Sequence, residues 1–398
     1  MTSETVTHKP LYDLAIWKNG LAFRNIQFSP KGKPVIKIAE LKNGITDQTK
    51  FTQDEFDDSV ALCTGDMVFS WSGNPETSID VFYYDLPDGW LNQHIFKVMP
   101  VDVDRSFLFY LLKYYKPTFT AIASNKQTTG LGHVTVKDLK ELIVDVPPRE
   151  TQRTIASTLS ALDARIAENR KINHHLEQMA QAIFKSWFVD FEPFGGMMLE
   201  DWREVPLGEV VEMSTKALNP QSCPDAILEH YSIPAFDETR LPVFEAASEI
   251  KSNKYIVDKD CFLISKLNPT TKRIWRPYCI SSHPVCSTEF MVYRTKNPAH
   301  KDFYYSVIDS PAFTDFLLSH ITGSTGSRQR AIPSETLAFA VVVPPDDIIE
   351  DFCDKVAPVY AHFEQNHLES RRLRQIRDSL LPRLMSGELS VADIGTAK

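Results

Sequence analysis

The feature that most constrains the fold is a long stretch of helix-forming residues between Pro147 and Pro193. Ala, Leu, Glu, Lys, Arg and Gln dominate it, and no proline or glycine lies between residues 149 and 192. Residues at alternating gaps of four and three form one stripe: Ile155, Leu159, Leu162, Ile166, Asn169, Asn173, Leu176, Ala180, Ile183 and Trp187. This heptad spacing predicts a helix that pairs with another helix along that stripe. A helix of about 39 residues would span roughly 58 Å.

The same pattern returns 197 positions later, where Val343-Pro344-Pro345 repeats Val146-Pro147-Pro148. The second stripe consists of Phe352, Val356, Val359, Phe363, Asn366, Ser370, Leu373, Arg377, Leu380 and Leu384. A single amphipathic helix ordinarily packs on its own domain. Two such helices at matched register favour pairing with each other. Pro358 lies inside the second helix, and we expect a kink there because proline removes one backbone hydrogen bond.

We expect the two helices to run antiparallel. The residues expected to pair them are Leu159, Leu162, Ile166, Asn169, Leu176, Val356, Val359, Phe363, Asn366 and Leu373. Asn169 and Asn366 should then lie near each other. A polar pair at such positions fixes the register of the helices at some cost in stability.

Residues 1–146 form a first block in which short β-type runs alternate with turn signals. The expected strands are 34–38, 66–70, 80–84, 95–98 and 142–146. Residues 105–115 predict a helix that Pro117 ends, and a polar loop should follow at Ser124–His133. Strands mixed with a few helices predict an α+β domain.

Residues 197–343 repeat this plan, with counterparts offset by 194 to 197 positions. The chain is therefore interpreted as a tandem duplication with pseudo-two-fold symmetry. We expect an α+β protein in which two similar domains are separated by two long antiparallel helices. The expected parts are domain 1 at 1–146, a long helical region at 147–196, domain 2 at 197–343, a second helical region at 344–389 and a tail at 390–398.

Composition places outer limits on function. The net charge is −9, which argues against a protein that binds nucleic acid without partners. The charge is uneven, however: residues 113–137, 265–282 and 319–334 carry lysine or arginine and no acid, while acids gather at 54–58 and 346–354. This allows a mildly basic face on an acidic protein. The polar first residues and the short apolar runs lead us to expect a soluble cytoplasmic protein without a membrane segment.

Motifs for catalysis or metal binding do not assemble in the sequence. The phosphate-binding Gly-x-x-x-x-Gly-Lys-Ser/Thr is absent, and the segments Asp145–Arg149 and Pro344–Asp346 lack the aromatic residue of an amino-methyltransferase motif. Cys279, His283 and Cys286 lie close together, but their spacing is irregular for a zinc site. We therefore expect ordinary buried thiols, no metal and no catalytic residue.

The helical motifs resemble the central and distal conserved regions of specificity subunits of type I restriction-modification enzymes. In the first helix the resemblance lies in Ile155-Ala156, Leu162-Asp163 and the aromatic run Trp187–Phe191, and in the second in Ser379–Leu389. Nearly the whole chain fits the layout of that family. Its recognition domains vary, so residues 1–146 and 197–343 add little to the resemblance.

The resemblance implies that each globular domain reads one half of a split site in double-stranded DNA. The long helices would set the gap and dock two methyltransferase subunits, and restriction subunits would join the complex. S-adenosylmethionine, ATP and Mg would be bound by those partners, and this chain would bind no cofactor and catalyse nothing. Half-sites should then lie about one DNA turn apart, roughly 34 Å.

Candidate DNA contacts are polar side chains on loops that could enter a groove. In domain 1 they are Lys126, Gln127, Thr128, Thr129 and His133, followed by Trp71, Ser72 and Asn74. In domain 2 they are Ser324, Thr325, Arg328, Gln329 and Arg330, followed by Lys266, Asn268, Thr271, Lys272 and Arg273. Each could instead be a solvated loop residue. Asn74 and Asn268 more often serve an Asn-Pro turn, and Trp71 could belong to the core.

Exposed arginines on the helices are candidates for the methyltransferase interface, namely Arg165, Arg170, Arg371 and Arg374. A solvated charged face is the more common explanation for each of them taken alone. Residues Trp187–Phe191 are apolar on all sides, so they are either domain core or a partner site. The competing class is a coiled-coil scaffold with two modules that bind protein or glycan.

Overall fold

The computed structural model describes residues 6–23, 26–127, 130–323 and 329–391. The chain divides into two compact units. The first unit holds residues 1–165 and 373–398, and the second unit holds residues 166–372. Each unit therefore contains one globular part together with a portion of both long helices.

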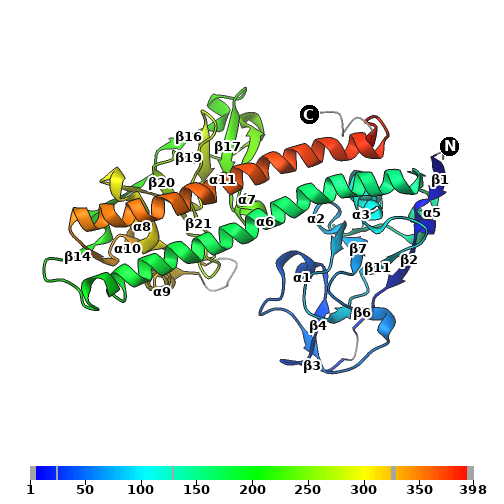
Figure 1. Cartoon of the computed structure of the whole chain (residues 1–398), viewed down its shortest axis with the longest axis horizontal. Helices are drawn as coiled ribbons and strands as arrows, with labels where there is room; N and C mark the ends of the chain where they lie inside the picture. The colour runs from blue at the N-terminus through cyan, green and yellow to red at the C-terminus, as the bar shows by residue number, and fades with distance from the viewer. Residues whose placement is uncertain (1–5, 24–25, 128–129, 324–328, 392–398) are drawn as a thin grey trace. The chain divides into compact units, whose positions relative to one another are not determined.

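The two long helices are α6 (Arg149–Phe188) and α11 (Asp346–Met385), of 40 residues each (Figure 1). Every residue of both predicted stripes is buried or half-buried, which confirms the heptad pattern. The helix α11 is assigned without interruption across Pro358. Two acidic residues, Asp346 and Asp347, lie in its first turn, where a negative charge stabilises the amino end of a helix.

The helices run antiparallel within each unit, as expected. In the second unit Asn173 Nδ2 donates to the carbonyl of Phe363 over 3.1 Å, and the rings of Phe188 and Phe352 lie 5.0 Å apart. In the first unit an ion pair of 2.6 Å joins Asp163 to Arg377. Residue numbers thus rise along one helix as they fall along the other.

The predicted proximity of Asn169 and Asn366 is confirmed, in a polar cluster within the second unit. Asn169 Nδ2 donates to Ser370 Oγ over 3.2 Å, and its contact with the carbonyl of Asn366 is 3.4 Å long. Asn366 Nδ2 donates to Asn173 Oδ1 over 2.9 Å. All four side chains are buried, so their hydrogen bonds specify one register of the two helices.

The globular part of the first unit contains two main sheets and two short strand pairs. The four-stranded sheet has the order β2 (Ala15–Asn19), β11 (Ile95–Pro100), β7 (Met67–Ser70), β9 (Asp80–Tyr83). The five-stranded sheet has the order β3 (Phe28–Ser29), β5 (Phe51–Thr52), β4 (Lys33–Ile36), β10 (Gly89–Leu91), β6 (Ala61–Leu62). The pairs are β1 (Thr7–Pro10) with β13 (Ile143–Val146), and β8 (Ser72–Gly73) with β12 (Gly132–His133). The helices are α1 (Ile38–Asn43), α2 (Pro75–Ser78), α3 (Arg105–Tyr114), α4 (Lys116–Asn125) and α5 (Val136–Glu141).

The second unit repeats this architecture. Its four-stranded sheet has the order β15 (Val211–Ser214), β23 (Phe290–Thr295), β20 (Cys261–Ser265), β21 (Ile274–Trp275). Its five-stranded sheet has the order β16 (Ala217–Leu218), β19 (Lys254–Ile256), β22 (Pro284–Ser287), β17 (Ile227–Tyr231), β18 (Val243–Ala246). The pairs are β14 (Arg203–Pro206) with β26 (Ala340–Val343), and β24 (Ile321–Thr322) with β25 (Arg330–Ala331). The helices are α7 (Ile233–Thr239), α8 (Lys301–Ile308), α9 (Pro311–Ser319) and α10 (Pro333–Thr336).

The tandem duplication is confirmed by sheet topology. The four-stranded sheets match strand for strand. The five-stranded sheets share the run β6-β10-β4-β5, which corresponds to β19-β22-β17-β18, and each contains one parallel pair inside this run. They differ in the added edge strand, which is β3 beside β5 in the first unit and β16 beside β19 in the second. The α+β class expected from the sequence is confirmed.

One helix was not predicted. The expected helix is α3, which ends at Tyr114 before Pro117, but a second helix, α4, begins at Lys116 and continues to Asn125. Pro117 lies in its first turn, where the missing backbone N–H has no helical partner to lose. The proline therefore starts a helix as well as ending one.

The cores answer one question that the sequence left open, and they show where two of the cysteines lie. Trp187 and Phe188 pack with Phe303 and Phe352, so the aromatic run at the end of α6 is largely core. Cys261 and Cys286 are buried in a cluster with Trp275, and burial raises the pKa of the Cys261 thiol to about 11. Within the described residues, we find no helix that combines the length and the apolar composition needed to cross a membrane.

Candidate nucleic-acid interface

Three segments of the first unit meet at one end of β7 and form what we call the first corner. The segments are Trp71 after β7, His94 before β11 and His133 in β12. The backbone of Trp71 joins them, because its N–H donates to the His94 carbonyl over 3.2 Å and its carbonyl accepts from Val134 over 2.8 Å. The backbone therefore fixes where these side chains originate.

The side chains of the first corner are aromatic rings and amides. Trp71 is half-buried, stacks on Phe96 at 5.6 Å and lies 5.7 Å from the His94 ring. Its indole N–H donates to Asn19 Oδ1 over 3.0 Å. Gln93 Nε2 lies 3.0 Å from His94 Nε2. The corner thus offers flat rings together with amide and imidazole groups.

The second unit builds the same corner from charged residues. Lys266 follows β20 as Trp71 follows β7. Its N–H donates to the Glu289 carbonyl over 2.9 Å, and its carbonyl accepts from Ala331 over 2.9 Å. Lys266, Glu289 and Arg330 therefore occupy the positions of Trp71, His94 and His133. We call this set the second corner.

A two-pronged ion pair dominates the second corner. Arg330 Nε and Nη2 donate to the two carboxylate oxygens of Glu289 over 3.1 and 3.2 Å. The Arg330 side chain is 45% exposed and that of Glu289 is 30% exposed. The hydrogen bond to Glu289 raises the pKa of Arg330 above its ordinary value, so the guanidinium stays charged. Such a fork favours one orientation of the guanidinium plane.

Several other predicted contact residues lie beside these corners. Ser72 pairs with His133 in the short β8–β12 ladder. Asn268 has a φ of 50°, and its N–H donates to the Gln329 carbonyl over 2.8 Å. The exposed Thr271 donates its N–H to the Asn268 carbonyl over 3.0 Å. The structure therefore brings Asn268, Thr271, Gln329 and Arg330 together through backbone hydrogen bonds.

Other predicted contact residues are held by contacts inside the protein. Asn74 caps α2 by accepting from the N–H groups of Glu76 and Thr77, so it serves the turn. Lys126 Nζ contacts Asp138 Oδ2 at 2.7 Å. Although burial acts to raise it, the pKa of Asp138 is below its ordinary value because Lys126 and Thr135 donate hydrogen bonds to the carboxylate. The neighbouring Gln127 is exposed.

Lys272 and Arg273 also have carboxylate partners in the second unit. Lys272 Nζ lies 2.7 Å from Asp309 Oδ1. Arg273 forms a fork with Asp237, with distances of 2.6 and 2.9 Å, and its side chain is only 9% exposed. These contacts direct both side chains toward helices rather than toward Arg330. Thr128, Thr129, Ser324, Thr325 and Arg328 lie outside the described residues.

Sequence reasoning missed His94, Asn19 and Glu289. Each belongs to a corner through a contact with a residue distant in the sequence. A usable signal existed only for His94 and Glu289, which precede the equivalent strands β11 and β23. Aligning the two halves by those strands would have paired them.

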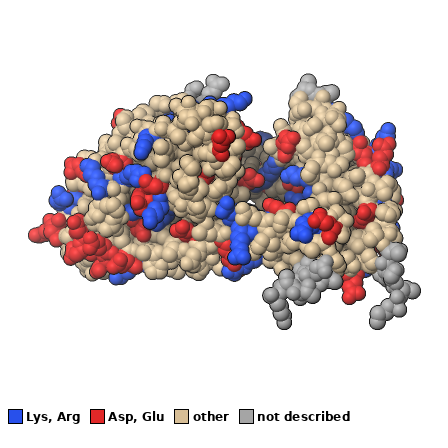
Figure 2. Space-filling view, turned by 90° about the horizontal axis from the view of Figure 1, so that it is seen from above, with Lys and Arg blue, Asp and Glu red and all other residues tan. Residues whose placement is uncertain are grey.

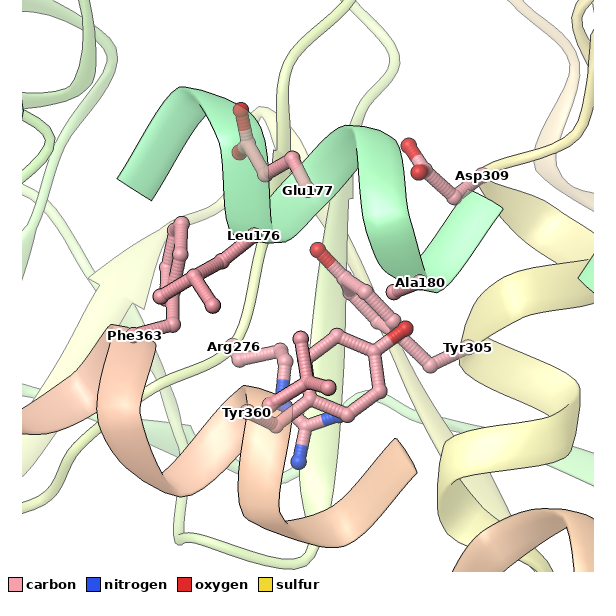
Figure 3. A pocket seen from close by; sticks show the side chains of 9 residues that line it. Leu176, Glu177, Ala180, Arg276, Tyr305, Asp309, Tyr360 and Phe363 are labelled. Atoms are coloured by element: carbon pink, nitrogen blue, oxygen red, sulfur yellow. The ribbon is translucent and has the colours of Figure 1, made fainter. Parts of the chain in front are cut away.

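The second unit also joins its globular part to both long helices through a half-buried arginine (Figure 3). Arg276 lies among Ala180 of α6, Tyr360 of α11 and Tyr305 of α8. Its Nη1 contacts Asp302 at 2.6 Å, and its guanidinium lies 4.0 Å from the Tyr360 ring centre. The remaining cavity is about 10 Å³, close to the minimum for one water molecule. This is a packed joint rather than a ligand site.

A larger groove of about 890 Å³ runs along the end of α6 in the same unit. Phe184, Phe188, Val307 and Val341 give it an apolar floor, and Val189 is 55% exposed at its edge. Figure 2 shows basic and acidic side chains mixed over much of one face, with a group of acidic side chains at its left end. The start of α11, which follows Arg330 by 16 positions in the sequence, carries exposed acids. They include Asp346, Asp347, Glu350, Asp351 and Asp354.

Comparison with known proteins shows which proteins this chain resembles. Residues 3–178 match the family model described as the type I restriction modification DNA specificity domain. The chain is 27% identical over 356 residues to the type I restriction enzyme HindI specificity subunit of Haemophilus influenzae, covering 71% of this chain and 77% of the relative. It is 26% identical over 336 residues to the MjaIX specificity subunit of Methanocaldococcus jannaschii, covering 76% and 73%.

A solved structure supports the fold. The type I restriction-modification system S subunit from M. genitalium superposes with a TM-score of 0.56 at 17% identity, covering 97% of each chain. The likeness at this identity concerns the arrangement of helices and sheets.

Proposed function

We propose that this chain, which carries a type I restriction modification DNA specificity domain and is related over most of its length to type I specificity subunits, recognises a bipartite site in double-stranded DNA. Each unit would read one half of the site. The observation that carries this proposal is the pair of corners, which share one backbone arrangement and differ in their side chains. Two readers of different sequences need this combination, since side chains carry base specificity and backbone geometry positions them.

The chain's role in this proposal is recognition and assembly. Two methyltransferase subunits would dock on exposed faces of α6 and α11, and restriction subunits would join them in the cytoplasm. Those partners would bind S-adenosylmethionine, ATP and Mg, and they would perform the chemistry. The net charge of −9 supports such partners, because an acidic chain needs further phosphate contacts to hold DNA tightly.

The test is to map DNA methylation base by base in cells that express this chain with a cognate methyltransferase subunit. The proposal expects methylation in one split motif with a fixed unread gap. Replacing residues 1–146 by the equivalent part of a relative should change one half of the motif and leave the other half unchanged. Absence of any motif, in an assembled complex that binds S-adenosylmethionine, would overturn the proposal and favour a scaffold that binds protein or glycan.

Salt dependence provides a second measurement on the purified complex. Binding to a duplex with the mapped motif should weaken as salt rises, with a log–log slope of about −0.9 for each phosphate contacted. The chain without the methyltransferase should show a much shallower slope. Equal slopes would contradict the idea that partners supply most of the phosphate contacts.

A further inference from the structure

We propose that Glu289 is a specificity-determining positioning residue, which holds Arg330 so that the free edge of its guanidinium reads a guanine in the half-site of the second unit. This inference rests on the proposed function and deepens it. It assigns a role to Glu289, and it names a base for one half of the DNA site.

The first argument is the number of N–H groups that remain available. A guanidinium carries five N–H groups, one on Nε and two on each Nη atom. Glu289 accepts from Nε and Nη2. Both N–H groups of Nη1 and one of Nη2 remain, and one N–H from each Nη atom forms the end edge of the guanidinium. Two parallel donors on that edge match O6 and N7 of guanine in the major groove.

The second argument is that the backbone of Arg330 is held from two sides. It pairs with Thr322 in the β24–β25 ladder, and it forms a β-bridge with Leu267. Thr322 Oγ1 also donates to the Arg330 carbonyl over 3.3 Å. Arg330 therefore starts from a defined position, and the fork to Glu289 fixes the far end of a long side chain. Pre-ordering of this kind lowers the entropy lost on binding.

The third argument is exposure. The Arg330 side chain is 45% exposed. Glu289 covers the edge formed by Nε and Nη2, so the exposure leaves the edge formed by Nη1 and Nη2 accessible. Arg273, by contrast, is 9% exposed and is held by Asp237. An exposed ion pair contributes little to folding stability, so the fork at Arg330 is better explained by orientation than by stability.

The two equivalent positions of the first unit carry no such ion pair, because His133 and His94 occupy the positions of Arg330 and Glu289. The inference is therefore restricted to one half of the site, and a methylation map can test this restriction directly.

The experiment uses the full chain with its methyltransferase subunit and begins with the wild-type motif. The half assigned to the second unit is the half that survives replacement of residues 1–146. We expect it to contain a guanine at which Arg330→Ala and Arg330→Lys each relax discrimination by about tenfold or more. Arg330→Lys keeps the charge but loses the planar fork, so binding to DNA without the motif should persist.

The decisive variant is Glu289→Gln, which keeps the size of the side chain and removes the carboxylate. It should relax discrimination at the same guanine while Arg330 remains in place. The matched control is Asp258→Asn. Asp258 Oδ1 accepts from Arg294 Nη1 over 3.0 Å at the opposite end of β23, and this variant removes the carboxylate from that contact. This control should leave the motif unchanged.

A second measurement requires no variant of the protein. In a set of duplexes, the guanines of that half-site are replaced one at a time by 7-deazaguanine. Each duplex then lacks the N7 acceptor at one position. The wild-type complex should lose about tenfold in affinity at the guanine that Arg330 reads and little at the others. This outcome does not depend on how well any variant folds.

Three outcomes would overturn the inference. Arg330→Ala could weaken all duplexes equally, which would indicate a phosphate contact. Glu289→Gln could tighten binding, which would show that the carboxylate competes with DNA, or it could leave the motif unchanged. If the wild-type complex itself shows no split motif, the proposed function fails first, and this result is distinct from the other three.

Discussion

The joints between globular parts and long helices show how differently two copies of one backbone can be filled. Position 6 of α3 is Tyr110, which donates to Asp163 of α6 over 2.6 Å. The same position of α8 is Ser306, which lies 3.1 Å from the hydroxyl of Tyr360 in α11. Asp163 and Tyr360 are themselves equivalent, so both units keep this contact. The tyrosine lies on the short helix in the first unit and on the long helix in the second.

A second contact exchanges its charges. In the first unit Asp80 of β9 contacts Lys113 of α3 and Lys116 of α4, each at 2.7 Å. In the second unit the cation is Lys272, and the anion is Asp309 at the position of Lys113. The strand registers make Arg273 the equivalent of Asp80, so Lys272 lies one position earlier. The comparison teaches that the duplicated backbone keeps an ion pair between this strand end and this helix. The residues that fill it changed in pairs, since a single change would leave a poorly paired group.

The largest expected difference between the joints concerns Phe352 and its equivalent Ile155. Phe352 is fully buried among the rings of Phe184, Phe188 and Phe303. We expect Phe352→Ala to destabilise the second unit by about 4 kcal/mol and Ile155→Ala to destabilise the first by about 3 kcal/mol. Hydrogen exchange, read by mass spectrometry for each unit, measures both losses. Loss of protection mainly in the unit that was not mutated would contradict the division into two units.

Substitution of the half-buried Arg276 should have the next largest effect. Removing its charge in Arg276→Met leaves Asp302 unpaired at 16% exposure, which we expect to cost about 3 kcal/mol. Arg377→Met in the first unit removes a more exposed ion pair and should cost about 1 kcal/mol. Thermal unfolding of the full chain measures both. The double variant Arg276→Met with Asp302→Leu should recover part of the loss, and no recovery would show that the ion pair is not the cause.

The pair of exchanged charges predicts a dependence on pH. Burial acts to raise the pKa of Asp80, but Lys113 and Lys116 outweigh it, and the pKa lies below its ordinary value near 3.8. The contribution is therefore present above about pH 4 and is lost as the pH falls through the folded-state pKa. Asp80→Asn should cost about 2 kcal/mol at pH 7, and its difference from wild type should shrink in acid. Denaturant unfolding across pH measures this.

A control for that prediction exchanges the two charges. Asp80→Lys combined with Lys113→Asp restores an ion pair with the charges reversed, as in the second unit, so it should be more stable than either single variant. A double variant that is no better than the worse single variant would show that the two sites are not equivalent.

The smallest effect should come from the polar cluster in the helix pair. Replacing Asn169 and Asn366 by Leu should stabilise the chain by about 1 kcal/mol, or roughly 2–4 °C in Tm, because two buried amides are removed. The register should loosen at the same time. Spin labels at the exposed positions Glu168 and Gln365 should then give a broader distance distribution. An unchanged Tm and an unchanged distribution would contradict the role of the asparagines.

Sequence patterns predicted the parts of this fold that repeat over many residues. The heptad stripes and the strands near 34–38, 66–70, 80–84, 95–98 and 142–146 are found within a few residues of the predicted bounds. The strands β3, β5 and β6 were missed because two residues are too few to show alternation. The helix α4 was missed because proline can begin a helix as well as end one.

The corners were harder to predict than the helices. Glu289 and Arg330 are 41 positions apart, and nothing local in either segment indicates the partner. The same holds for Arg273, whose carboxylate partner Asp237 lies on α7. The contacts of surface side chains depend on which segments the fold brings together. Residue type and loop position therefore identify candidate DNA contacts but not the partner that each side chain has within the protein. The interpretation of Asn74 as a turn residue succeeded because a helix cap is a local contact.

The paired strands β14 and β26 have a consequence for how such a protein can change over generations. They bring Arg203 beside Val343, so the intervening segment begins and ends at one place, next to the start of α11. The strands β1 and β13 do the same from Thr7 to Val146, next to the start of α6. A gene crossover at the two ends of such a pair transfers an entire folded part and leaves the codons of both long helices unaltered. One recombination event of this kind replaces one globular part as a whole. A crossover inside a globular part would instead combine two halves of different cores, which would have to pack together.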